Sequence, residues 1–242
     1  MWPLLLREWW RFVRQPVRIV AVVSVPLFFW WIVGAGFGGS FAAADGSRYG
    51  TFVLPGAGLL GVLFSAIFST ISVIDDRENG FLQGVVVAPF GRRAFVGAKL
   101  VSGAGFSTLQ AALVWVVAGV PLGHLAGLLV ATATVSLGLV ALGFIIAWLT
   151  ESVAAYHSAM NSGFMPLWAL SGALFPVESA APWLRVVMLA NPLTYGLRWL
   201  RSAAAGQAID GQAVAVSLVL AAVLIGLCLV FADRDARPRL TA

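Results

Sequence analysis

The titratable side chains of this sequence do not combine into a recognisable catalytic site. His124, Glu151 and His157 fall at the ends of long apolar runs, where solvation is a simpler role for them than proton transfer. The only lysine, Lys99, lacks the directly preceding glycine and the following Ser or Thr of a Walker A loop. Ser171 lies in a stretch similar to a nucleophile loop, but the nearest histidine on the same helix would be about 20 Å away. We therefore expect no catalytic residue, no metal ligand and no cofactor in this chain.

Three serines in one apolar run share a helical face. Ser65, Ser69 and Ser72 follow one another at spacings of four and three residues. Such residues form hydrogen bonds between helices inside a membrane, and they also line paths for polar groups. The spacing leaves both roles open, so these serines are a possible substrate path.

A dense run of charges ends the same apolar stretch. Four consecutive charged residues precede a short apolar segment that Pro89 terminates. An exposed apolar patch beside charges, with no domain of its own to bury it, is typical of a docking site for another protein. A helix lying flat on the membrane is the alternative. The residues predicted to dock are Asp75, Asp76, Arg77, Glu78, Gly80, Phe81, Leu82, Val85 and Pro89.

A second mixed segment, residues 178–207, alternates apolar patches with arginines. No patch is long enough to cross a membrane, and Asn191-Pro192 interrupts the pattern. We expect two short amphipathic helices, with Arg198 and Arg201 sharing a cationic face at the outer headgroup level. They would form a lid made of Asn191, Pro192, Tyr195, Arg198 and Arg201, whereas a plain external loop is the alternative.

Composition places these residues in a membrane. Of 242 residues, 60% are hydrophobic and only 10% are charged, with a mean hydropathy of +0.94. A soluble surface needs far more charge, so soluble enzymes and nucleic-acid-binding modules are excluded. We predict an all-α membrane protein that forms a single domain over residues 1–242. Its six spans are expected at about residues 19–38, 52–74, 100–120, 125–149, 159–177 and 212–231.

The distribution of positive charge predicts the orientation. Eleven of the fifteen Lys and Arg residues lie in the N-terminal arm, the segment 75–99 and the C-terminal tail, which places both termini in the cytoplasm. The segment 75–99 is then a cytoplasmic loop, and 178–207 is external. Tryptophans and arginines alternate before the first span, so residues 1–18 are expected to form an interfacial helix.

Three ordered motifs carry a resemblance to a known family. The first is Asp76-Arg77-Glu78-Asn79-Gly80-Phe81-Leu82, with the later Ala88-Pro89 and Lys99. The second is Leu170-Ser171-Gly172-Ala173-Leu174-Phe175-Pro176, and the third is Asn191-Pro192-Leu193-Thr194-Tyr195-Gly196 with Arg201. All three resemble segments of ABC type-2 permeases. These are the membrane subunits of ATP-binding-cassette exporters, such as drug and polysaccharide or lipooligosaccharide exporters.

The resemblance implies how the chain would work. It implies a six-span subunit that pairs with a second copy or a close homologue in the cytoplasmic or inner membrane of a prokaryote. A separate ATPase subunit would bind ATP and Mg, and the segment 75–99 would couple its motion to outward movement of an amphiphilic or hydrophobic substrate. Membrane lipids are further partners, and nucleic acid is not. A channel or scaffold that needs no ATPase is the alternative function.

Overall fold

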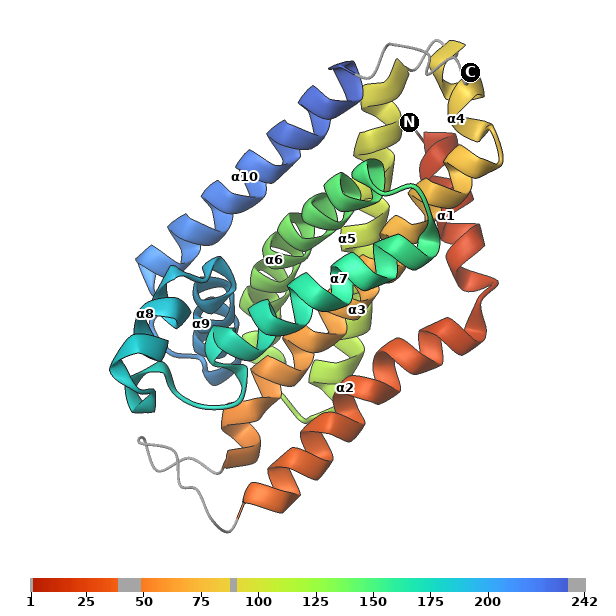
Figure 1. The fold of residues 1–242 in the computed structure, drawn as a ribbon. Helices are drawn as coiled ribbons and strands as arrows, with labels where there is room; N and C mark the ends of the chain where they lie inside the picture. Colours follow the sequence, from red (N-terminus) through yellow and green to blue (C-terminus); the bar gives the residue numbers. More distant parts are fainter. Residues whose placement is uncertain (1, 39–48, 88–90, 235–242) are drawn as a thin grey trace.

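A computed structural model describes residues 2–38, 49–87 and 91–234, and within these ranges the chain is helical without strands (Figure 1). The helices of the first half are α1 (Trp2–Val13), α2 (Pro16–Phe37), α3 (Tyr49–Glu78), α4 (Phe81–Val87), α5 (Gly91–Val117) and α6 (Leu122–Leu149). The second half contains α7 (Val153–Trp168), the π-helix η1 (Ala169–Ala173), the short 3₁₀ turn η2 (Val177–Ser179), α8 (Pro182–Ala190), α9 (Pro192–Ala205) and α10 (Gly211–Arg234).

Five helices of the described residues are long and apolar enough to cross a membrane. They are α3, α5 and α6, with Ile19–Phe37 of α2 and Gly211–Phe231 of α10. The stretch expected as a fifth span, 159–177, is not among them, because α7 has only 16 residues before the backbone changes to the π-helix η1. The all-helical membrane class is therefore established, and the sixth crossing stays a prediction.

Burial divides the long helices into an inner and an outer set. Most of α3 is buried, and α5 and α6 pack against it, whereas α2 and α10 flank the bundle on opposite sides and have few buried residues (Figure 1). The exposed side chains of α2 are large and apolar, as at Phe28 and Trp31. Surfaces of this kind suit lipid or another membrane helix, not water.

Glycines allow the inner helices to approach closely. A Cβ on Gly58 of α3 would lie 1.9 Å from Trp115 Cη2 of α5, and a Cβ on Gly103 of α5 would lie 2.8 Å from Ser69 Oγ of α3. Small residues at such crossings bring helix backbones together where lipid provides no hydrophobic driving force. This packing fixes α3 against α5, so that Ser69 faces α5 within the same chain.

The end of α3 differs from the sequence prediction. The segment 75–99 was expected to leave the membrane as a loop, but α3 continues through Glu78 and α5 already begins at Gly91. The helix stops at Asn79-Gly80: Asn79 Nδ2 donates to the Asp75 carbonyl at 2.8 Å, and Gly80 has a φ of 71°. An Asn-Gly pair that accepts a left-handed conformation is a helix stop signal. The four charges are thus the last turn of α3.

At the other end of the bundle, the segment 178–207 forms η2, α8 and α9, with the break at Asn191-Pro192. The apolar face of α9 is buried, including Leu193, Leu197 and Leu200, as the spacing predicts. This face packs on α6 and α10, and so α9 is an integral part of the bundle.

Candidate functional site

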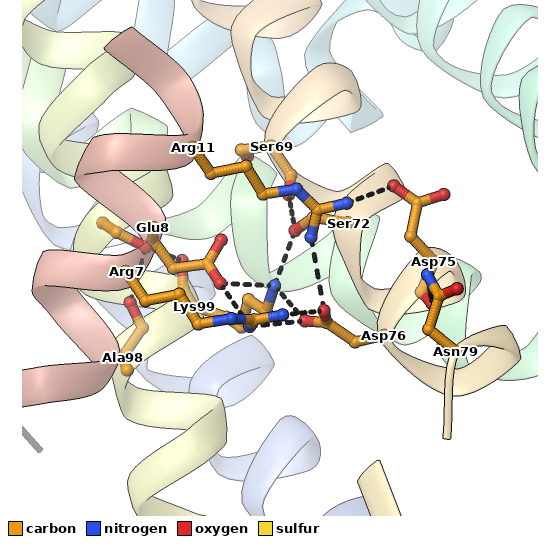
Figure 2. Close-up of polar contacts among 11 residues, drawn as sticks. Arg7, Glu8, Arg11, Ser69, Ser72, Asp75, Asp76, Asn79, Ala98 and Lys99 are labelled. Carbon is orange, nitrogen blue, oxygen red and sulfur yellow. Dashed lines mark hydrogen bonds and ion pairs between the residues drawn. The ribbon is translucent and has the colours of Figure 1, made fainter. Parts of the chain in front are cut away.

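Among the described residues, the largest group of interacting charges lies at one end of the bundle, where α1 packs on α5 beside the end of α3 (Figure 2). Arginines four residues apart share one face of α1, and two adjacent aspartates occupy the last turn of α3. We call this group the ionic cluster; its members are Arg7, Glu8, Arg11, Asp75, Asp76 and Lys99.

Lys99 occupies the centre of the ionic cluster and is only 4% exposed. Its Nζ lies 2.9 Å from Glu8 Oε1, 2.6 Å from Asp76 Oδ2 and 2.7 Å from Ser72 Oγ. A lysine ammonium has three protons to donate, and this one is surrounded by three acceptors, one on α1 and two on α3. The lysine therefore joins α1, α3 and α5 at a single atom.

Asp76 is the corresponding anionic centre and is 1% exposed. Arg7 Nη2 lies 2.6 Å and Arg11 Nη1 3.2 Å from its Oδ1, while Arg7 Nη1 and Lys99 Nζ approach Oδ2 at 3.3 and 2.6 Å. Arg11 also pairs with Asp75 at 2.6 Å. The three cations and three carboxylates balance, which offsets the large cost of burying Glu8, Asp76 and Lys99.

Burial and charge act in opposite directions on Arg7. Burial alone would lower the pKa of its guanidinium, but the hydrogen bond to Asp76 and the charges of Asp76 and Glu8 raise that pKa above its ordinary value. Arg7 therefore keeps its charge at any physiological pH. Its Cζ also lies 3.8 Å from the centre of the Phe81 ring, which links α1 to α4 by a cation–π contact.

Aromatic packing reinforces the attachment of α1. The Phe12 ring stacks on Phe106 of α5 with centroids 4.0 Å apart and an interplanar angle of 15°, and Trp9 contacts the same ring at 4.5 Å. Apolar and ionic contacts thus hold one face of α1 on α5. The geometry joins α1, α3, α4 and α5 into one unit.

The predicted docking residues divide into inward-facing and exposed sets. Asp75 and Asp76 belong to the ionic cluster, and Arg77 donates to the carbonyls of Trp148, at 3.3 Å, and Thr150 at the end of α6. Among the docking residues that the structure describes, Glu78 alone is exposed, as is Asn79 beside it. Gly80 forms the turn between α3 and α4.

The expectation of an exposed apolar patch is wrong for the described residues of α4. Val85 is 6% exposed, and Phe81 and Leu82 pack half-buried against the core, with Phe81 6.4 Å from the Phe95 ring. The sequence prediction had treated the first turns of α5 as part of a loop. These turns form an apolar surface, and the side chains of α4 pack against it. Pro89 lies outside the described residues.

Two of the three serines, Ser69 and Ser72, lie between α3 and α5. Ser72 accepts a hydrogen bond from Lys99 and donates to the Ser69 carbonyl at 2.6 Å, and Ser69 Oγ donates to the Ala66 carbonyl at 3.0 Å. Ser65 is 2% exposed, and its hydroxyl has no hydrogen-bond partner among the described residues. The bond between Ser72 and Lys99 corresponds to the helix-packing alternative, and the substrate path stays a prediction. A substrate path along this face would first require α3 and α5 to separate.

A second cluster of contacts lies at the opposite end of the bundle, where α7 gives way to η1. Gly172 has a φ of 87°, and carbonyl groups freed there accept hydrogen bonds from distant side chains. We call this arrangement the carbonyl cluster. The donors are Asn191 Nδ2 to Leu167 O at 2.6 Å, Arg201 Nη2 to Gly172 O at 3.1 Å, and Tyr49 hydroxyl to Leu174 O at 2.6 Å.

The predicted lid residues are distributed around the carbonyl cluster in an unexpected way. Asn191 and Pro192 begin α9, and Tyr195 donates to the Leu189 carbonyl at 3.1 Å. The expected common headgroup face of the two arginines is wrong. Arg201 reaches inward, with its Cζ 4.1 Å from the Phe52 ring centre, whereas Arg198 lies 5.8 Å from the centre of the Tyr195 ring.

Sequence reasoning missed the ionic cluster as a unit. It treated Arg7 and Arg11 as headgroup contacts, and it did not use Glu8 at all. A lone acidic residue within an arginine-rich helix, and a lone lysine at the start of an apolar run, were the available signals. Each buried charge requires a partner, so these residues were candidates for one another.

An all-helical bundle with several membrane-length apolar helices defines a multi-pass membrane protein. Within that class, the chain belongs to the ABC-2 type transporter family, whose sequence model matches residues 1–204. It is therefore a transport permease.

Several known permeases align with most of this chain. The daunorubicin resistance ABC transporter permease protein DrrB1 of Streptomyces coeruleorubidus is 27% identical over 233 residues, covering 90% of this chain and 82% of the relative. Putative transport permeases ycf38 are 26% identical in Cyanophora paradoxa, over 78% of this chain and 68% of the relative, and 28% identical in Pyropia yezoensis, over 82% and 70%.

Proposed function

We propose that this chain is the membrane subunit of an ABC exporter that moves an amphiphilic or hydrophobic substrate outward. A separate ATPase subunit would bind ATP and Mg and hydrolyse the nucleotide, so this chain is not itself an enzyme. The observation that carries the proposal is the buried ionic cluster next to the exposed turn at Glu78 and Asn79. A rigid, charge-balanced unit beside an exposed turn is suited to receive motion from a partner.

In this proposal α3 transmits the motion. It has 30 residues, which corresponds to about 45 Å of helix. One end carries Asp76 in the ionic cluster, and the other carries Tyr49 and Phe52, which contact Leu174 and Arg201 of the carbonyl cluster. Closure of the ATPase subunits would shift the unit of α1, α3, α4 and α5. The same displacement would then reach η1 and α9, which release the substrate.

We further propose the membrane arrangement that this function requires. The ionic cluster and both termini would lie in the cytoplasm, and the carbonyl cluster would lie outside, in the cytoplasmic or inner membrane of a prokaryote. Six crossings follow if α7 with η1 spans the bilayer. A second copy or close homologue would complete the path, and the exposed apolar sides of α2 and α10 offer surfaces to it and to lipid.

The position of Glu78 supports a partner at the exposed turn. Glu78 is the last residue of α3, where the partial negative charge of the helix end disfavours a carboxylate. The side chain is exposed, so burial in this chain does not explain it. A cationic surface on the ATPase subunit would explain why an acidic residue occupies this position.

Reversing the charge of Glu78 tests the proposal. Glu78→Lys is expected to weaken binding of the ATPase subunit about tenfold or more, or about 1.4 kcal/mol, because like charges would then meet at the contact. The fold should be unaffected, since a cation suits a helix C-terminus. The measurement is co-purification with the ATPase and its transport-coupled ATP hydrolysis in vesicles.

Glu178→Lys is the matched control, because Glu178 is also exposed but lies at the opposite end of the bundle. It should leave both readouts at the wild-type level. If Glu78→Lys binds and stimulates the ATPase like wild type, the turn after α3 is not the coupling contact.

A further inference from the structure

An open pocket lies beside α1 on the side away from α5. Its volume is about 560 Å³, and its lining includes Arg7, Trp10, Arg11, Arg14, Gln15 and Asn79. The three arginines lie at spacings of four and three residues, so they follow one face of the chain. We call this hollow the cationic pocket.

The cationic pocket has an excess of positive charge. Arg7 and Arg11 are balanced within the ionic cluster by its carboxylates, including Asp76, which also borders the pocket. Arg14 is exposed, and within the described part of the chain it makes neither an ion pair nor a side-chain hydrogen bond. One guanidinium is therefore available to an anion from outside the chain.

The start of α2 adds to this positive potential. Gln15 precedes the 22-residue helix without capping it through its side chain, and Pro16 occupies the first turn. The N-terminus of a helix carries a partial positive charge and unpaired N–H groups, and it attracts phosphates. Because Gln15 lines the cationic pocket, this helix end and Arg14 act on the same space.

The remaining face of α1 indicates where the anion comes from. Trp2, Leu6 and Val13 lie on one side of the helix and are exposed, and Trp10, at the pocket, is 61% exposed. An exposed apolar stripe beside a row of arginines is the pattern of a helix at the surface of a bilayer. A soluble acidic partner would satisfy the arginines but leave the stripe in water, whereas a lipid supplies both a phosphate and acyl chains.

We propose that the cationic pocket binds the phosphate of an anionic phospholipid of the adjoining leaflet. Arg14 and Arg11 face the phosphate, the start of α2 adds its dipole, and Trp10 lies at the boundary between headgroup and acyl chains. The lipid fixes the depth of α1, and therefore of the ionic cluster, relative to the membrane surface. This inference does not depend on the ATPase assignment, and either can fail alone.

The test measures lipid binding to the purified full-length chain in non-ionic detergent. Native mass spectrometry gives the dissociation constants of added phosphatidylglycerol and phosphatidylcholine. Wild type should prefer phosphatidylglycerol, and Arg14→Gln should weaken that binding about fivefold, the value of one arginine near an anionic headgroup. The matched control is Arg185→Gln, an exposed arginine of α8, which should change nothing.

Three outcomes would overturn the proposal. The first is equal binding of phosphatidylglycerol by wild type and Arg14→Gln at unchanged thermal stability. The second is displacement of phosphatidylglycerol by millimolar inorganic phosphate, which would indicate a site for a soluble anion. The third is an Arg14→Gln variant that binds phosphatidylglycerol normally but loses the ATPase subunit, which would assign the pocket to a protein contact.

Discussion

Replacing Lys99 with methionine is expected to lower the free energy of unfolding by about 3–5 kcal/mol, the cost of removing one partner from a buried ion group. Glu8 and Asp76 would lose their contacts of 2.9 and 2.6 Å to Nζ, and the cluster would acquire a net negative charge. The measurement is denaturation of the purified chain in detergent, followed by its circular dichroism.

Two comparison variants sharpen this prediction. Arg185→Met, at an exposed position of α8, should cost less than about 0.5 kcal/mol. Adding Glu8→Gln to Lys99→Met restores the balance between cations and carboxylates, so the double variant should recover about half of the loss. A double variant that is less stable than Lys99→Met would show that the cluster is not held together by charge balance.

Arg201→Ala is expected to cost about 1.5–3 kcal/mol, the range for a hydrogen bond from a charged group. It removes the donor to the Gly172 carbonyl and the contact with Phe52 that ties α9 to α3. Because the carbonyl cluster would lose one of its three side-chain donors, we also expect the export rate to change several-fold. Thermal stability and export from reconstituted vesicles are the readouts.

Arg198→Ala serves as the internal comparison, since it removes the same side chain three residues earlier on α9. It loses only a ring contact at 5.8 Å, so its effect on stability should stay within about 0.5 kcal/mol. Equal effects of the two substitutions would support the prediction that both arginines face the lipid headgroups. They would contradict the inward contacts of Arg201.

Much of the fold could be predicted from the sequence, because charges mark where apolar helices end. The apolar face of α9 and the break at Asn191-Pro192 followed from spacing and proline chemistry. The end of α3 could also have been predicted, since Asn79-Gly80 is a helix stop signal. The sequence prediction instead treated residues 75–99 as a loop from the first of the four charges.

The ionic cluster was harder to predict. Arg7 and Asp76 are 69 residues apart, and only the docking of α1 on α5 brings them together. Local spacing determines which residues share a face of one helix, but it does not determine which helix that face meets. The same limit applies to Arg201, whose partner Gly172 lies in a π-helix that the periodicity did not indicate.

The central claim is that ATP hydrolysis by a partner drives export through this chain. The most direct test reconstitutes the chain in vesicles, with and without its ATPase subunit, and follows ATP-dependent movement of a lipophilic fluorescent dye. We predict movement only when the chain, the ATPase subunit, ATP and Mg are all present, and its loss with Glu78→Lys. Equal dye movement without the ATPase subunit or without ATP would contradict the account and identify the chain as a channel.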